Sequence, residues 1–258
     1  MKLTCATYNI LHGYYKDQIF KNIKTLIEKG ADVICIQEAE IEIESVLPSG
    51  WKIEYFRHDI GCNLAIAWNS PMLDCKEKKT ILYQPLPKPA FMQRLTNYKN
   101  KIIPRGAITV LFTFTGEGKT IRITNTHLAW EGGMKNKAKE LKELLQFRGG
   151  EKVDTEILAG DFNTNIPAVL RRVEERRVEN ILGKEFDNVF PNIKYTCDLS
   201  YTDPQDGLEK IAKFWRFFGV KLKSRLDYIF TKNLKIISKE MLDLPGSDHR
   251  PLLATFEV

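Results

Sequence analysis

A set of carboxylates, amides and histidines stands at the ends of apolar, strand-like runs in this sequence, where its members could act together. They are Asn9, Glu38, His127, Asp161, Asn163, Asp227, Asp248 and His249. Carboxylate oxygens are ligands that Mg²⁺ and Mn²⁺ prefer, and such an ion would neutralise the charge of a phosphate group. The histidines and an aspartate would move protons or stabilise developing charge. The set therefore favours metal-assisted chemistry on a phosphate ester.

The stretch ILAGDFNTN, residues 157–165, shows the spacing of two of these side chains. On an extended chain alternate side chains point to opposite sides, so Asp161 and Asn163 would share one side while Phe162 faces the core. The same pair could instead form an Asx turn that caps the next helix. Each other member alone would also suit an ordinary turn, strand end or core position. Only their joint occurrence indicates a site.

Hydrophobic periodicity predicts the elements that must position these residues. A strand over residues 2–10, a helix over 17–30 and a strand over 32–38 make an α/β opening. Further strands are predicted at residues 51–56, 63–68, 74–82, 107–114, 120–128, 157–161, 225–230 and 251–258. Strand ends are where α/β scaffolds build sites, because a rigid sheet can aim side chains into one crevice.

Two more helices complete the predicted elements. Residues 134–147 place an apolar face on one side of an amphipathic helix. That face consists of Ala138, Leu141, Leu144 and Leu145. A further helix starts after Asn163 with a polar cap and Pro167 in its first turn, and it runs into the segment RRVEERR. Glutamates between these arginines pair with them at helical spacing, which indicates a solvated helix face rather than a nucleic-acid contact.

A coarse internal echo indicates the fold class. The segments ADVICIQE and DTEILAGDFN both follow an amphipathic helix and bring an acid to the end of an apolar strand. This echo predicts an α/β fold of two similar halves, with two β-sheets packed face to face and helices outside. No linker-like stretch divides the chain, so we expect one domain over residues 1–258.

Composition is that of an ordinary globular protein. The chain has 258 residues with 43% hydrophobic and 28% charged residues, and no apolar run approaches the ~20 residues of a membrane helix. The first residues lack a signal-peptide pattern, so we expect a cytoplasmic monomer without stable membrane insertion. The net charge of +6 permits a polyanionic or phosphorylated partner without specifying one.

The cysteines and histidines are scattered. Among the five cysteines, Cys5 and Cys35 lie in apolar runs and are expected to be buried free thiols. No Cys-x-x-Cys pair occurs, and the four histidines lie far apart in the sequence. This spacing favours no zinc site.

Seven short segments, taken in order, resemble one known family. They are TYNIL, ICIQE, PRGAITV, TNTHL, AGDFNT, RLDYIF and SDHRPLLATF, and together they span nearly the whole chain. The sequence is similar to the endonuclease/exonuclease/phosphatase superfamily of DNase I-like, metal-dependent phosphohydrolases. The resemblance implies a four-layer α/β sandwich of two mixed β-sheets with helices outside, which agrees with the two-halved pattern.

The resemblance also implies roles for the metal and water groups. Glu38 matches the principal ligand of Mg²⁺ (or Mn²⁺), Asn9 lies beside it, and Asp248 joins the metal environment. Asp161 matches the residue that orients or deprotonates the attacking water. Asn163 matches the amide that holds the scissile phosphate or the nucleophile.

Further roles concern the phosphate. His249 matches the histidine that contacts a phosphoryl oxygen, and Asp227 matches the carboxylate that orients it. His127 matches a histidine that contacts phosphate or serves as an acid, and Arg105 is similar to a basic residue at the phosphate rim. In-line displacement at phosphorus gathers negative charge on the equatorial phosphoryl oxygens. A bound metal ion and these side chains together would stabilise that charge.

These residues predict hydrolysis of a phosphodiester, with nucleic acid among the plausible substrates. A phosphomonoesterase and a phospholipid- or sphingomyelin-type phosphodiesterase are the alternatives. A non-enzymatic binding module is disfavoured because none of the matching positions is substituted.

The sequence leaves the role of two long segments open. Residues 83–104 interleave aromatic and basic residues, which suits either base stacking or a solvated loop. Residues 206–218 are predicted to form a helix with core aromatics.

Overall fold

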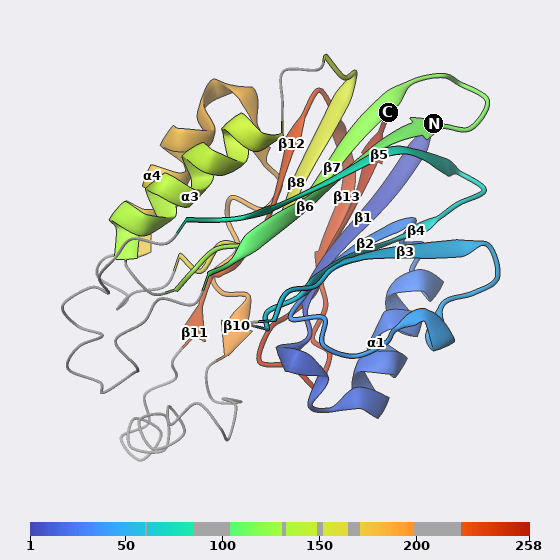
Figure 1. Ribbon diagram of the computed structural model, residues 1–258, viewed down its shortest axis with the longest axis horizontal. Helices are drawn as coiled ribbons and strands as arrows, with labels where there is room; N and C mark the ends of the chain where they lie inside the picture. The colour runs from blue at the N-terminus through green and yellow to red at the C-terminus, as the bar shows by residue number, and fades with distance from the viewer. Residues whose placement is uncertain (60, 85–103, 131–132, 149–151, 165–170, 199–222) are drawn as a thin grey trace.

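Two six-stranded mixed sheets pack their apolar faces against each other in the computed structural model (Figure 1). The structure describes residues 1–59, 61–84, 104–130, 133–148, 152–164, 171–198 and 223–258. The predicted loop at 85–103 and the predicted helix at 206–218 fall outside the described residues.

The first sheet has the strand order β13-β14-β1-β2-β4-β3. Its strands are β1 (Lys2–Asn9), β2 (Val33–Gln37), β3 (Trp51–Phe56), β4 (Leu64–Asn69), β13 (Lys235–Met241) and β14 (Leu252–Glu257). Strands β1 and β2 run parallel and are joined by the turn η1 (Leu11–Gly13) and helix α1 (Lys16–Glu28); the other neighbours are antiparallel. A second short turn, η2 (Glu44–Val46), precedes β3.

The second sheet has the order β5-β6-β7-β8-β12-β9. Its strands are β5 (Leu73–Leu82), β6 (Gly106–Phe114), β7 (Thr120–His127), β8 (Thr155–Asp161), β9 (Asp187–Asn188) and β12 (Asp227–Lys232). Parallel strands β7 and β8 are joined through helix α3 (Gly133–Phe147). The remaining elements are α4 (Arg171–Leu182), η3 (Gly183–Glu185) and the short pair β10 (Cys197–Asp198) and β11 (Lys223–Ser224).

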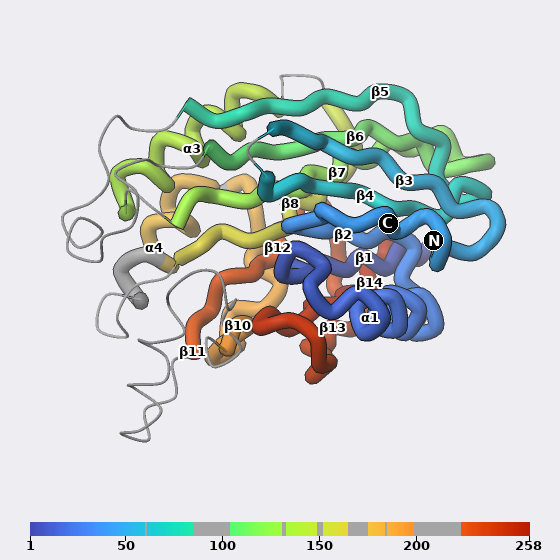
Figure 2. Tube along the Cα trace, turned by 60° about the horizontal axis from the view of Figure 1, so that its bottom comes forward, coloured from blue at the N-terminus to red at the C-terminus, as the bar shows by residue number. Residues whose placement is uncertain are grey.

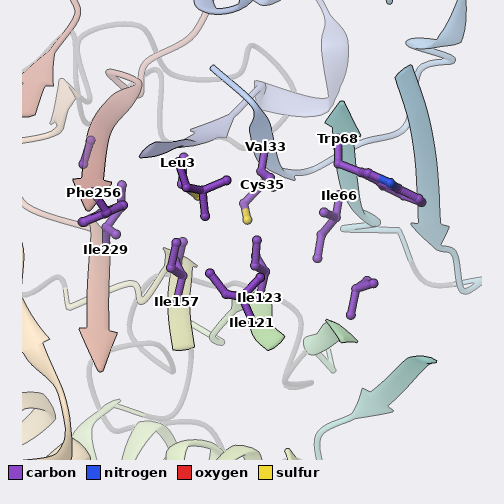
Figure 3. Packing of buried hydrophobic residues seen from close by; sticks show 14 of the residues in the cluster. Leu3, Val33, Cys35, Ile66, Trp68, Ile121, Ile123, Ile157, Ile229 and Phe256 are labelled. Carbon is purple, nitrogen blue, oxygen red and sulfur yellow. The ribbon is translucent and has the colours of Figure 1, made fainter. Parts of the chain in front are cut away.

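Three apolar layers hold the sheets and helices together. Between the sheets, Leu3, Val33 and Cys35 of the first sheet face Ile123 and Ile157 of the second (Figure 3). A second core lies between α1 and the outer face of the first sheet. The third lies between α3, α4 and the outer face of the second sheet. The order helix, sheet, sheet, helix is visible in Figures 1 and 2, and it confirms the predicted four-layer α/β sandwich.

Strand periodicity predicted most elements, and two differences stand out. Strand β13 was missed because most of its side chains are exposed, with lysines among them, so no buried apolar run marks it. Helix α3 has a partly polar buried face: Asn136, Lys137 and Glu140 are fully buried beside Leu141, whereas Ala138 is only half-buried. Glu140 Oε2 accepts the N–H of Ala129, so this polar face supports the loop that follows β7.

Two further observations concern elements that the sequence addressed. Helix α4 begins at Arg171, and the expected first turn with Pro167 falls outside the described residues. None of the five cysteines, all of which the structure describes, forms a disulfide, and Cys5 and Cys35 are buried as expected. Within the described parts of the chain, no helix is long and apolar enough to cross a membrane.

Candidate active site at the strand ends

Parallel pairing brings the predicted site residues to one edge of the two sheets. Strands β1 and β2 end together at Asn9 and Gln37, which places Glu38 just beyond the edge of the first sheet. Strands β7 and β8 end together at His127 and Asp161 in the second sheet. The two edges meet, because the amide Nδ2 of Asn9 donates a hydrogen bond to Asp161 Oδ2 across 3.1 Å.

Asp161 and Asn163 are held by a turn rather than by an extended strand. Asp161 Oδ1 accepts the backbone N–H of Asn163 at 2.8 Å, and Asn163 has a left-handed φ of 46°. The expected strand alternation is therefore wrong at Asn163, and the Asx turn is present. Phe162 still faces the core as predicted, fully buried with its ring centroid 5.3 Å from those of Tyr228 and Phe230.

Asn163 links the turn to His127. Its Nδ2 donates to the carbonyl oxygen of Leu128 at 2.8 Å and lies 3.0 Å from His127 Nε2. Because a carbonyl only accepts, this contact fixes the amide orientation, and the second amide hydrogen reaches Nε2. Burial, together with the charges of Arg105 and His249, holds the pKa of His127 well below its ordinary value. His127 is thus a neutral imidazole that accepts from Asn163.

His249 and Asp227 form a buried pair beside Asp161. Strand β12 begins opposite the end of β8, so that Asp227 is in register with Asp161. His249 Nδ1 lies 2.8 Å from Asp227 Oδ2, and its Nε2 lies 3.8 Å from Asp161 Oδ2. Burial opposes a charge on His249, but the Asp227 carboxylate, together with Cys197 and Asp248, outweighs burial and raises the His249 pKa well above its ordinary value. The pair therefore presents an imidazolium to Asp161.

The two remaining aspartates of the site hold their protons unusually well. Burial, together with Asp227 and Glu38 and against the charge of His249, raises the pKa of Asp161 to about 7. Burial and the Glu38 charge, again against His249, raise the pKa of Asp248 to about 6. A carboxyl with a pKa near neutrality suits the exchange of a proton with water.

Several contacts join the predicted metal residues. Ser247 Oγ donates to the backbone oxygen of Asn9 at 2.8 Å and lies 3.4 Å from Asp248 Oδ1. Glu38 acts on Asp161 and Asp248 through its charge. The donor set of carboxylate and amide oxygens fits a hard divalent cation. Two buried acceptor atoms, Glu38 Oε2 and Asp227 Oδ1, receive no hydrogen bond from the described residues, as a site for a cation requires.

Ligand atoms of the described acids, histidines and cysteines gather in three groups within 4.8 Å. The groups are Asp161, Asp227 and His249; Cys197, Asp248 and His249; and His12, Glu38 and Cys62. Glu38 and Asp248 thus fall in different groups.

Arg105 lies beside His127, because it precedes Gly106, which is in register with His127 on β7. It is only 6% exposed and contacts Cys62 Sγ. Most of its side chain is inaccessible, so its charge acts on the neighbouring histidines from within the protein.

Several residues at the site were missed from the sequence. Cys197 forms an isolated backbone bridge with His249, and its Sγ lies 3.8 Å from Asp248 Oδ2. Gln37 donates through Nε2 to Asn125 Oδ1 at 2.6 Å, a buried hydrogen bond between the two sheets. Gln37 stands next to Glu38, and Asn125 lies in the segment TNTHL two residues before His127, so both carried a signal; nothing in the sequence marks Cys197.

His12 was also missed as a site residue. Its Nε2 lies 3.3 Å from Glu38 Oε2, and its Nδ1 lies 3.2 Å from Glu40 Oε2. Burial would lower the pKa of His12, but the hydrogen bond to Glu40 and the charges of both glutamates raise it to about 9. This part of the site therefore favours positive charge.

Comparison with solved structures supports this fold. D. rerio TDP2 in complex with a single-strand DNA product superposes with a TM-score of 0.71 and 17% identity, covering 100% of this chain and 99% of that one. The human Nocturnin catalytic domain with bound sulfate gives 0.68 and 18%, covering 99% and 93%. A mannosyl-6-phosphatase of Bacteroides thetaiotaomicron gives 0.70 and 16%, covering 99% and 100%. These likenesses concern the fold.

Comparison with sequences assigns the family. No curated protein matches the sequence significantly. The model of the Endonuclease/Exonuclease/phosphatase family matches residues 6–249, which include every predicted site residue from Asn9 to His249. The chain therefore belongs to the Endonuclease/Exonuclease/phosphatase family, whose members are phosphoric ester hydrolases.

Proposed function

We propose that the protein hydrolyses a phosphodiester by in-line attack of water, with Mg²⁺ or Mn²⁺ as cofactor. The observation that carries this proposal is the buried Asp227–His249 pair next to Asp161. The pair is joined by a 2.8 Å contact, and its imidazole faces the Asp161 carboxyl at 3.8 Å. A proton acceptor and an imidazolium side by side match the two demands of phosphoryl transfer to water.

Asp161 would take the proton of the attacking water. Its pKa of about 7 leaves an ionised fraction at neutral pH that is basic enough to accept a proton. Hydrogen bonds from Asn9 and from the backbone of Asn163 hold both carboxyl oxygens in place. Both amide hydrogens of Asn163 are donated within the protein, so its amide oxygen is the atom that would orient the water.

His249 would stabilise the charge that grows on the phosphoryl oxygens. The Asp227 carboxylate, together with Cys197 and Asp248, keeps the ring protonated against the effect of burial, and Asp227 also fixes the ring orientation through Nδ1. Nε2 is then the atom that turns to the substrate. Neutral His127 would act through Asn163 rather than as an acid.

The cation would be held by Asn9, Glu38 and Asp248. Oxygen donors of this kind suit Mg²⁺ or Mn²⁺. When bound, such an ion supplies neutralisation of phosphate charge. The side chains described above orient the water and hold the protons.

Two exposed tyrosines favour a substrate with a planar base. Tyr14 and Tyr15 follow the His12-Gly13 turn and are 43% and 53% exposed. The Tyr14 ring lies edge-on to the His12 ring, with centroids 5.6 Å apart. Exposed aromatic rings next to a phosphate site are suited to base stacking. The DNA product bound to D. rerio TDP2 is of this class.

The test is a hydrolysis panel with purified protein. Single-stranded DNA, single-stranded RNA, bis(p-nitrophenyl) phosphate, a glycerophosphodiester and mannose 6-phosphate are each incubated with Mg²⁺ or Mn²⁺, with and without EDTA. We expect cleavage of the nucleic-acid diesters that EDTA abolishes. Cleavage of mannose 6-phosphate alone would replace the diesterase with a monoesterase, the activity named for the Bacteroides structure. Equal rates with and without EDTA would contradict the metal dependence.

A further inference from the structure

His12 is clamped between two glutamates at the side of the site that faces the first sheet. Its Nδ1 lies 3.2 Å from Glu40 Oε2, and its Nε2 lies 3.3 Å from Glu38 Oε2. The third neighbour is Cys62, whose Sγ lies within 4.8 Å of the ligand atoms of His12 and Glu38. A nitrogen, an oxygen and a sulfur atom therefore face one another.

The backbone holds this cluster firmly. Gly13, directly after His12, packs so closely that a Cβ there would lie 2.5 Å from the Ile41 side chain. The turn that carries His12 is thereby fixed against the chain next to Glu40. Glu40 Oε1 in turn accepts the backbone N–H of Asn63 at 3.0 Å, and Glu40 also accepts a backbone hydrogen bond from Cys62.

Glu40 orients the imidazole. The Nδ1–H of His12 donates to a carboxylate that is itself held by backbone hydrogen bonds, which presents Nε2 to Glu38. A carboxylate behind one ring nitrogen is the usual arrangement around a histidine that binds a metal through the other nitrogen. Although Nε2 and Glu38 Oε2 are 3.3 Å apart, Oε2 accepts no hydrogen bond from any described residue. The N–H of a protonated ring would thus not point at this oxygen.

We propose that His12 Nε2, Glu38 Oε2 and Cys62 Sγ form a second divalent-cation site that prefers Zn²⁺ or Co²⁺ to Mg²⁺. Imidazole and thiolate are ligands of these softer ions, whereas Mg²⁺ takes oxygen ligands. This site lies beside the oxygen-lined position of Asn9, Glu38 and Asp248. It rests on the proposed function only in sharing Glu38 with that position.

The cluster is accessible enough to load. The side chain of His12 is 28% exposed and that of Glu38 12%, so an ion can enter past the imidazole, whereas Cys62 is buried. Binding would release the thiol proton of Cys62. Arg105 contacts the same sulfur and would share the thiolate with the ion.

The spacing of cysteines and histidines in the sequence favoured no zinc site. The structure explains why this spacing does not indicate the proposed cluster. The three ligands come from three segments: the turn after β1, the residue after β2 and the loop before β4. No two of them lie within a short motif, so only the packing of these segments brings them together.

The test is a Co²⁺ titration of the tag-free, metal-free protein, followed by its absorption spectrum. We expect one Co²⁺ to bind with d–d bands and a thiolate-to-cobalt charge-transfer band. Cys62→Ser should remove the charge-transfer band. His12→Asn, chosen because Asn tolerates the left-handed φ of 54° at this position, should weaken Co²⁺ binding by about 10- to 100-fold. Glu40→Gln should weaken it by about the same factor.

Matched controls use residues of the same types outside the cluster. His58→Asn and Cys75→Ser should leave the Co²⁺ spectrum and affinity unchanged, and thermal unfolding should confirm that each variant is folded. No charge-transfer band in the parent protein, or unchanged Co²⁺ affinity in both His12→Asn and Cys62→Ser, would overturn the site in favour of a plain imidazolium between two carboxylates. Mg²⁺-dependent hydrolysis without a cobalt spectrum refutes this site alone. A cobalt spectrum without hydrolysis refutes the proposed function alone.

Discussion

Asp161 is the residue at which the two halves of the molecule meet. One of its carboxyl oxygens binds Asn9 from the first sheet, and the other binds the turn that leads to Asn163. His249 approaches from the loop before β14, with Nε2 3.8 Å from the same carboxyl. The pKa of Asp161, about 7, is raised by burial and by the Asp227 charge and is lowered by the His249 charge. The chemistry of Asp161 therefore depends on both sheets.

Asp227→Asn tests the charge on His249. Asn keeps a hydrogen-bond acceptor for Nδ1 but removes the carboxylate that contributes most to raising the His249 pKa against burial. Activity that needs the imidazolium is lost as pH rises through that pKa, so the variant should lose activity at lower pH than the parent. We expect kcat to fall by about 10²- to 10⁴-fold.

The measurement is the pH profile of kcat/KM on the best substrate of the panel. An alkaline limb displaced to lower pH in a folded Asp227→Asn variant supports the role of Asp227 in keeping His249 protonated. An alkaline limb at the same pH in parent and variant would show that Asp227 does not set the ionisation of His249.

At the residue level, sequence predicted which side chains gather but not how they are held. Asp161, Asn163, Asp227 and His249 were expected together, and they are in contact. The left-handed φ of Asn163 could not be read from an alternating pattern, because the strand ends at Asp161. His12 carried no signal, since its partners lie in other segments.

Among the elements, β8 depends on a close approach to β7. Gly160 has a φ of 140°, and a Cβ there would lie 1.9 Å from the backbone oxygen of Thr126. Only glycine allows this spacing, and it sets the position of Asp161 relative to His127, its register partner. The glycine before the aspartate is therefore part of what positions the site.

Gly160→Ala should destabilise the fold strongly. The added methyl group would collide with backbone rather than with a movable side chain, and we expect a loss of about 3 kcal/mol or more in the free energy of unfolding. Gly118→Ala is the matched control, since it has a φ of 70° with nothing within 4 Å and should cost about 1 kcal/mol. Urea unfolding measures both, and equal losses would contradict the close approach.

Element prediction succeeded where burial follows a simple period. Strands β1, β2, β6 and β8 are buried almost throughout, and their apolar runs were visible in the sequence. Strand β13 is exposed along most of its length, so its pairing with β14 had no signal. The buried Lys137 and Glu140 of α3 defeat any assignment of a helix face from apolar residues alone.

The whole molecule is two sheets whose shared edge forms the site. The echo of a helix followed by an acid-ending strand predicted the two halves, and both parallel pairs show it. The buried hydrogen bond from Gln37 to Asn125 ties the sheets together one residue from Glu38. Strand order and this cross-link depend on long-range pairing, which no local pattern contains. That residues 1–258 form one domain and a cytoplasmic monomer stays a prediction.

The most direct test of the convergence is the rate of Asp161→Asn. Asn has nearly the same shape but cannot take a proton from water, so we predict a fall in Mg²⁺-dependent hydrolysis of about 10²- to 10⁴-fold. The substrate is bis(p-nitrophenyl) phosphate or the best diester of the panel. Asp154→Asn, in the exposed turn that binds Thr120, is the control and should keep the parent rate. A folded Asp161→Asn protein that hydrolyses the diester at the parent rate would contradict the account.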